Sequence, residues 1–102
     1  EHEEFESRLG NVAVTKSHIE RDERVSEKWN EIMDSFSSDE IIDKIHFSEI
    51  EEIELNPEFM FPNIRIKTGG DWKRMFFFEE ETAENCFKTL RYRLNSFRQV
   101  FG

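Results

Sequence analysis

Apolar and polar positions alternate most regularly in the second half of the chain. Short alternating runs at Ile45–Phe47 and Ile53–Leu55 predict two strands, and the run Ile64–Phe78 predicts a hairpin. Apolar residues then recur at steps of three and four along Thr82–Phe101, which predicts one long amphipathic helix. Strands closed by a single C-terminal helix predict an α+β fold, in which an antiparallel, strongly bent sheet or a partly open barrel is capped by that helix.

The turns and ends of these elements carry signals of their own. Gly69 and Gly70 permit the positive φ angles of a tight hairpin turn. Thr82 is a suitable N-cap for the helix, and Gly102 is suited to end it. The apolar stripe of the helix predicts its buried face, which comprises Ala83, Cys86, Phe87, Leu90, Leu94, Phe97 and Phe101.

The first third of the chain predicts a hairpin and an inserted helix. Residues 1–8 are mostly charged, so we expect a frayed or edge-strand start. Val12 and Val14 belong to an alternating run that turns at residues 16–17 and returns with a short strand from Ile19. The period then changes to that of a helix over about 24–36, which we interpret as an insertion packed on the sheet. Its stripe consists of Val25, Trp29, Ile32, Met33 and Phe36.

Extended structure is predicted again for residues 41–47. A bend follows at Ser48–Glu49, and a second extended run covers Ile50–Leu55. The acidic residues of this run predict a solvated face made of Glu51, Glu52 and Glu54.

The returning strand of the last hairpin ends in Met75–Phe78, which is apolar on both faces. One face meets the core, so the other must be covered by the terminal helix, the inserted helix or a partner. We expect Trp29 and Phe36 of the inserted helix to cover Met75 and Phe77.

The composition fits a single domain over residues 1–102, with eleven Phe residues that predict a core of large rings. The only cysteine, Cys86, lies on the inward stripe of the helix, where we expect it to act as an apolar filler. A lone thiol also favours a reducing, cytoplasmic compartment. No apolar stretch is long enough to predict a transmembrane helix. The chain begins at Glu1 rather than Met, which fits the removal of an upstream segment.

The charge disfavours two classes of partner. Fourteen basic and 23 acidic residues give a net charge of −9, which opposes binding to nucleic acid and to anionic membranes. Residues 81–102 carry +2, which leaves −11 for the rest. Basic residues late in a helix also complement its dipole, so stabilisation of the helix is the simpler account of this pattern. The basic residues are Lys88, Arg91, Arg93 and Arg98.

The order of these elements resembles the pleckstrin-homology (PH) superfold, which includes GRAM, phosphotyrosine-binding and FERM third-lobe domains. Gly10–Ile19 resembles the valine-threonine, turn, isoleucine hairpin of bacterial and archaeal PH-like domains, and Ile45–Ile53 resembles their strand junction. Ile64–Gly70, Trp72–Phe78 and Ala83–Leu94 look like the last hairpin and the capping helix. The resemblance implies a bent sheet capped by a helix, and a role in recognition rather than in catalysis.

Two departures from the PH pattern bear on fold and function. The helix predicted at 24–36 is additional to a minimal PH domain. Phosphoinositide-binding members carry several basic residues near their first three strands, whereas here Arg8, Lys16, Arg21 and Arg24 stand among many acids. The resemblance therefore does not imply that this chain binds lipid headgroups.

Catalytic and metal signatures are weak. His2, His18 and His46 lack the close spacing of a zinc site, and we interpret His18 and His46 as exposed turn or strand residues. Carboxylates such as those at 79–81 are too common in this chain to indicate acid–base chemistry. No nucleophile-elbow or Gly-rich phosphate motif occurs. We expect neither an enzyme nor a cofactor or metal site.

The segment Asn56–Pro62 places three large apolar residues, Phe59, Met60 and Phe61, between prolines. They cannot all point inward from an extended chain, so at least one should face solvent unless a neighbour covers it. One interpretation is a docking knob for a partner. The other is that Phe59 and Phe61 anchor the loop into the edge of the sheet.

These patterns favour a non-catalytic PH-like module that binds a protein or peptide partner, or a second copy of itself. The candidate surfaces are a strand edge beside the terminal helix, the 59–61 loop and the basic helix face. An alternative is recruitment to anionic membranes, and a third is a ligand binder or small enzyme with a cavity in the sheet, which eleven Phe residues would tend to fill. The candidate partner-binding residues are Phe59, Met60, Phe61, Lys88, Arg91 and Arg98.

Overall fold

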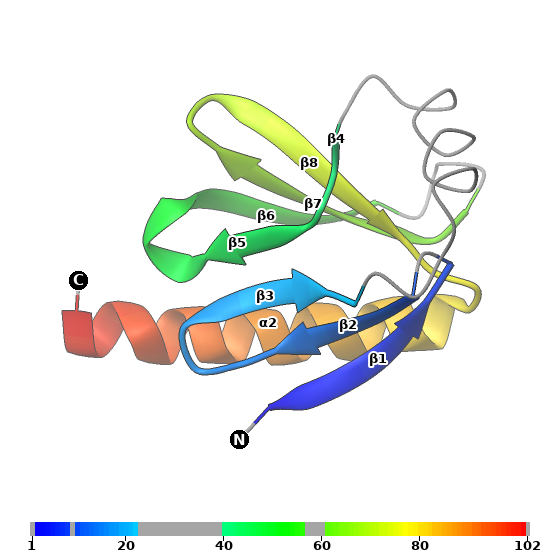
Figure 1. Ribbon diagram of the computed structural model, residues 1–102. Coiled ribbons are helices and arrows are strands. Elements are labelled where there is room, and N and C mark those ends of the chain that lie inside the picture. Colours follow the sequence, from blue (N-terminus) through cyan, green and yellow to red (C-terminus); the bar gives the residue numbers. More distant parts are fainter. Residues whose placement is uncertain (1, 9, 23–39, 57–60, 102) are drawn as a thin grey trace.

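The computed structural model describes residues 2–8, 10–22, 40–56 and 61–101. Two sheets and one long helix make up this part of the chain (Figure 1). The first sheet has the order β1 (Glu3–Ser7), β2 (Gly10–Val14), β3 (His18–Arg21), β5 (Lys44–His46). The second has the order β4 (Glu40–Ile41), β8 (Asp71–Phe76), β7 (Asn63–Thr68), β6 (Ile50–Asn56). A 3₁₀ turn, η1 (Phe47–Glu49), links β5 to β6, and the C-terminal helix is α2 (Glu80–Phe101).

Neighbouring strands are antiparallel except for the short β4, which runs parallel to β8. The predicted α+β class, with antiparallel strands capped by one C-terminal helix, is confirmed, although the strands form two sheets that do not close into a barrel. The segment 1–8, predicted as frayed or as an edge strand, contains the edge strand β1. The helix predicted at 24–36 lies outside the described residues, as do Trp29 and Phe36.

The chain crosses between the sheets at residues 42–43, inside the run predicted as one strand over 41–47. Ile42 is buried and its N–H donates to the carbonyl of Arg74 at 3.0 Å, which ties it to β8. The carbonyl of Asp43 instead accepts from the N–H of Arg21 at 2.8 Å, which ties it to β3. The prediction of continuous extended structure is wrong here because these long-range hydrogen bonds pull neighbouring residues to different sheets.

The bend predicted at Ser48–Glu49 is confirmed as part of η1. His46 caps this turn, since its Nδ1 accepts from the N–H of Ser48 at 3.2 Å. The glycine turn is confirmed as well: Gly69 and Gly70 have φ angles of 56° and 87° and join β7 to β8.

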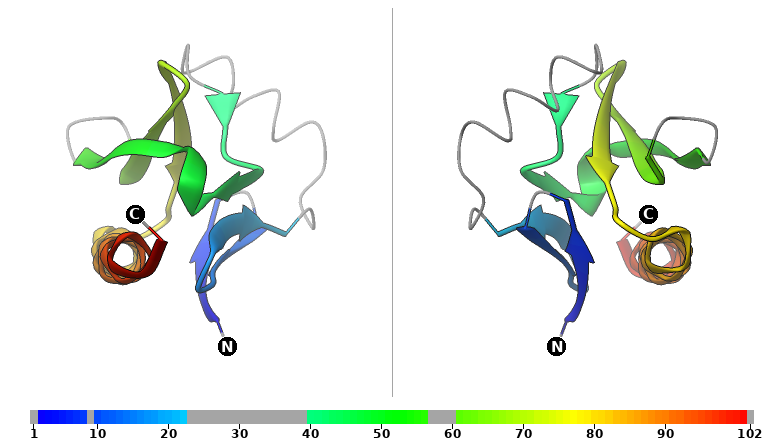
Figure 2. Two further views of the ribbon diagram at one scale, coloured as in Figure 1. Left: turned by 90° about the vertical axis from the view of Figure 1, so that its left-hand side faces the viewer. Right: turned by 90° about the vertical axis from the view of Figure 1, so that its right-hand side faces the viewer.

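Helix α2 packs against strands of both sheets, namely β1 and β2 of the first and β6 and β7 of the second. Viewed along its axis in Figure 2, the helix lies beside the first sheet and below the second. Ala83, Cys86, Leu90 and Leu94 of its predicted stripe are buried in the core, and Phe87 and Phe97 are partly buried against it.

Two details of the helix differ from prediction. It begins at Glu80 rather than after a Thr82 N-cap, and this start places Glu80 and Glu81 at the positive end of the helix dipole, where acidic residues are stabilising. Phe101 shares the angular position of the stripe but is exposed, because neither sheet covers the last turn.

The apolar run Met75–Phe78 begins in β8, which ends at Phe76 and not at Phe78 as predicted. Met75, Phe76 and Phe77 are buried, whereas Phe78 is half-exposed. In the described ranges, the remaining buried apolar residues are Val12, Val14, Ile19, Ile42, Ile45, Phe47, Ile50, Ile64 and Ile66.

We predict that Cys86 is protected from thiol reagents in the folded protein. Burial raises the pKa of this thiol from 9.0 to about 12, and the thiolate is the reactive form. At pH 8 a shift of this size lowers the thiolate fraction by roughly three orders of magnitude. Reaction with an aromatic disulfide reagent should therefore be at least about 100-fold slower in native buffer than in urea. Free cysteine controls for the effect of urea on the reagent, and equal rates would show that α2 does not bury this side chain.

Candidate functional site

The C-terminal half of α2 exposes large apolar side chains. Tyr92 is 73% exposed, and Val100 and Phe101 are each 74% exposed. Tyr92 and Val100 are eight residues apart on the helix, so they lie on one side of it, with Ser96 between them. Exposed apolar side chains that gather in one place are characteristic of contact surfaces.

These side chains border a hollow of about 350 Å³ between α2 and the turn that joins β2 to β3. Figure 1 shows this turn beside the C-terminal part of the helix. We call the hollow the α2 groove. Its described lining consists of Lys16, Tyr92, Arg93, Ser96, Phe97, Val100 and Phe101.

Phe97 connects the groove to the core. Its ring meets the rings of Phe47 and His46 edge-on, with centroid distances of 5.8 and 5.7 Å. The ring of Phe101 lies 4.8 Å from that of Phe97. Because Phe47 is buried, this series of rings fixes one wall of the groove on the hydrophobic core.

The groove differs in charge from the rest of the protein. Among its described lining residues Lys16 and Arg93 are cationic and none is acidic. The whole chain carries a net charge of −9. The groove is therefore a locally basic, largely apolar surface on an acidic protein.

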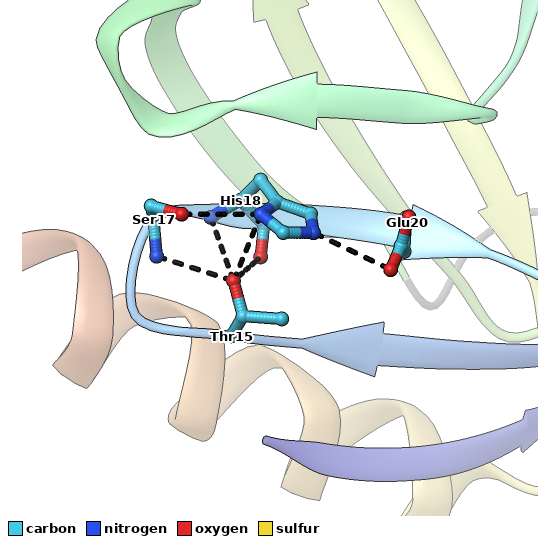
Figure 3. Close-up of polar contacts among 4 residues, drawn as sticks. All are labelled: Thr15, Ser17, His18 and Glu20. Atoms are coloured by element: carbon cyan, nitrogen blue, oxygen red, sulfur yellow. Dashed lines mark hydrogen bonds and ion pairs between the residues drawn. The ribbon is translucent and has the colours of Figure 1, made fainter. Parts of the chain in front are cut away.

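A network of hydrogen bonds holds the turn that carries Lys16 (Figure 3). Thr15 Oγ1 accepts from the N–H groups of Ser17 and His18 at 3.2 and 3.0 Å, and it donates to the carbonyl of His18 at 3.1 Å. His18 Nδ1 lies 3.1 Å from Ser17 Oγ, and its Nε2 lies 3.4 Å from Glu20 Oε1. These bonds fix the backbone on both sides of Lys16.

Ser17, His18 and Glu20 have the residue types of a nucleophilic triad, but their geometry is that of a turn. Acyl transfer requires backbone N–H groups directed at the developing oxyanion. The N–H groups of Ser17 and His18 instead donate to Thr15 Oγ1. The arrangement therefore stabilises the turn, and because these two N–H groups already donate within the turn, they do not form an oxyanion hole.

Of the two histidines predicted to be exposed, only one is. His18 is half-buried rather than exposed, while His46 is exposed as expected. The two stand opposite each other on β3 and β5. No group of three or more His, Cys, Asp or Glu residues that could hold a metal ion is found within the described ranges.

The three basic helix residues that were predicted to bind a partner do not line the groove. Lys88 and Arg91 are exposed, with the Arg91 guanidinium 5.9 Å from the centroid of the Phe87 ring. Arg98 Nη2 donates to the carbonyl of Ile50 at the start of β6, at 3.2 Å. The hydrogen bond directs Arg98 toward β6, and none of the three residues lines the α2 groove.

Phe61 is the described part of the predicted apolar loop. Its ring is partly buried, meets Phe76 edge-on at 6.2 Å, and lies 3.9 Å below the guanidinium of Arg8. Arg8 also stands 4.7 Å above the ring of Phe78 and donates from Nε to the carbonyl of Phe77 at 3.0 Å. Phe61 is thus placed as the anchoring interpretation expects, and Phe59 and Met60 lie outside the described residues.

Sequence reasoning missed the groove residues Lys16, Tyr92, Arg93, Val100 and Phe101 as a candidate surface. Tyr92 and Val100 did carry a signal, because both are apolar and lie off the Ala83–Phe101 stripe. The sequence carried no signal for the proximity of Lys16 to the helix, since this proximity depends on contacts between segments that are distant in sequence.

Comparison with known proteins gives no match: no family model fits the sequence, and neither a curated protein nor a solved structure is significantly similar to the chain. Within the described residues, no helix has the length and apolar character needed to cross a membrane.

We predict that Arg8 and Phe61 are energetically coupled. A stacked guanidinium contributes about 0.5–2 kcal/mol through the ring face, so Arg8→Met and Phe61→Leu together should cost less than the sum of their separate costs by about that amount. Urea unfolding of the two single variants and the double variant measures the coupling. Arg91→Met combined with Phe61→Leu is the matched control and should be additive. Additive costs for Arg8 and Phe61 would contradict the anchoring role.

Proposed function

We propose that this chain is a non-catalytic, PH-like protein-interaction module whose contact surface is the α2 groove. The observation that carries the proposal is the exposure of Tyr92, Val100 and Phe101 around one hollow. Leaving three large apolar side chains in water is unfavourable, and burial of such side chains against a partner is a common source of binding free energy.

The strand order supports the PH-like part of the proposal. A four-stranded antiparallel sheet is followed by the antiparallel strands β6, β7 and β8 and then by a closing helix. The resemblance stated from the sequence implies antiparallel strands in a bent sheet followed by one closing helix, which agrees with this succession in outline. Since a fold shared by many proteins does not determine function, the functional part of the proposal depends on the groove and not on the fold.

Charge favours a protein partner over a lipid surface. A net charge of −9 opposes approach to anionic lipid headgroups. Arg98, one of the basic residues on which membrane recruitment would depend, is hydrogen-bonded to the backbone of β6. A groove between a turn and a helix also suits inserted side chains better than a flat bilayer surface.

We predict that groove substitutions abolish selection of peptide ligands. With the immobilised chain as bait for a displayed random-peptide library, enrichment should occur with the native protein and with Gln99→Asp, a charge control at an exposed helix position. It should fall at least about 10-fold with Val100→Asp, because the introduced carboxylate must be desolvated in the interface.

Circular dichroism and urea unfolding establish that the variants remain folded. Equal enrichment with Val100→Asp and Gln99→Asp would exclude the groove as the contact surface. Binding to anionic vesicles at low salt, together with failure to enrich any peptide, would favour the membrane alternative instead.

A further inference from the structure

The chemistry of the α2 groove restricts what it can accept. Its apolar surface comes from Tyr92, Phe97, Val100 and Phe101, while the two cations stand on different elements, Lys16 on the β2–β3 turn and Arg93 on the helix. We propose that the groove binds a short acidic segment of a partner protein, with apolar side chains in the hollow and a carboxylate at Lys16. This inference rests on the proposed function and adds the chemical class of the partner.

Charge complementarity is the first argument. In a protein of net charge −9, the general field attracts basic peptides and repels acidic ones. A site lined by two cations, with no acid among its described lining residues, reverses that preference locally. Such a reversal favours specificity, because the groove attracts an acidic segment that the overall charge of the protein repels.

The size of the groove is the second argument. About 350 Å³ lies near the lower end of the volumes of roughly 300–1,000 Å³ that are typical of small-ligand pockets. It therefore suits a few apolar side chains of a peptide rather than the face of a folded domain. The same size argument favours a short segment over the folded surface of a second copy of this chain as the occupant.

The rigidity of the two walls is the third argument. The Thr15 hydroxyl holds the turn at Lys16 through hydrogen bonds to the N–H groups of Ser17 and His18. Phe97 holds the other wall through its ring contacts with Phe47 and Phe101. Walls that are fixed before binding reduce the entropy cost of ordering the site, so a short segment can bind with useful affinity.

The charge composition of selected peptides tests the inference. Peptides enriched from a random library by the native chain should carry Asp or Glu beside apolar residues, against the preference of the overall field for basic peptides. Lys16→Glu should reduce this acidic content and shift the selected peptides toward neutral or basic ones. Lys88→Glu makes the same change of charge at an exposed helix position outside the groove and should leave the acidic content unchanged.

A selected peptide, synthesised with a fluorescent label, gives the affinity by fluorescence anisotropy. Lys16→Glu should weaken its binding by about 2- to 5-fold for the loss of one exposed ion pair, and by more where repulsion adds to that loss. Raising the salt concentration should weaken native binding and diminish the difference between the native protein and Lys16→Glu.

The possible outcomes separate the two proposals. If the native chain enriched neutral or basic peptides, and did so equally with Lys16→Glu but not with Val100→Asp, the acidic-segment inference would be overturned. The proposal of an interaction module would stand. Enrichment that is equal in native protein and Val100→Asp would overturn the groove itself, and absence of any enrichment would overturn both. A sedimentation coefficient that rises with protein concentration, and rises less for Val100→Asp, would show that the groove binds a second copy of the chain instead of a partner protein.

Discussion

Burial of one helical stripe against two open sheets is the constraint on which this structure depends. Ala83, Cys86, Leu90 and Leu94 are buried while α2 contacts strands from both sheets. Neither sheet closes on itself, so each has an apolar face that requires cover. Complete burial of a leucine side chain contributes roughly 1.5–3 kcal/mol, so Leu90 and Leu94 alone are comparable to a sizeable part of a small domain's stability.

The candidate site follows from the length of the same helix. After Leu94 the helix continues to Phe101, where neither sheet covers it. Phe97 lies between the buried and the exposed part of the helix, because its ring contacts both buried Phe47 and exposed Phe101. The β2–β3 turn approaches this part of the helix and brings Lys16 to it. The candidate binding surface thus lies where a structural element continues past the core that it helps to form.

Local patterns predicted most of the elements. The Gly69–Gly70 hairpin, the bend at Ser48–Glu49 and the C-terminal helix each depend on nearby residues, through glycine φ angles, interrupted alternation and helical periodicity. The division into two sheets depends on the hydrogen bonds of residues 42–43 with distant strands, which no local pattern records. The exposure of Phe101 was missed for a related reason. Periodicity gives the side of the helix on which a residue lies, but it does not give the point along the helix beyond which the sheets no longer cover that side.

Less of the site than of the fold was predictable. Arg98 belongs to the predicted basic face, yet a carbonyl 48 residues earlier in the chain accepts its hydrogen bond. Arg91 and Lys88 are exposed as predicted, but the hollow lies elsewhere, between Lys16 and the line Tyr92, Ser96, Val100. Charge and periodicity placed one of three candidate surfaces on the helix. The approach of the β2–β3 turn decides which side of the helix borders the hollow.

The most direct test of this account is a chemical-shift map of the isotopically labelled chain titrated with a peptide selected by it. The account predicts that the largest shifts occur at Lys16, Tyr92, Ser96, Val100 and Phe101, with little change along β6. Shifts centred on Lys88, Arg91 and the edge of β6, with the β2–β3 turn unaffected, would contradict it.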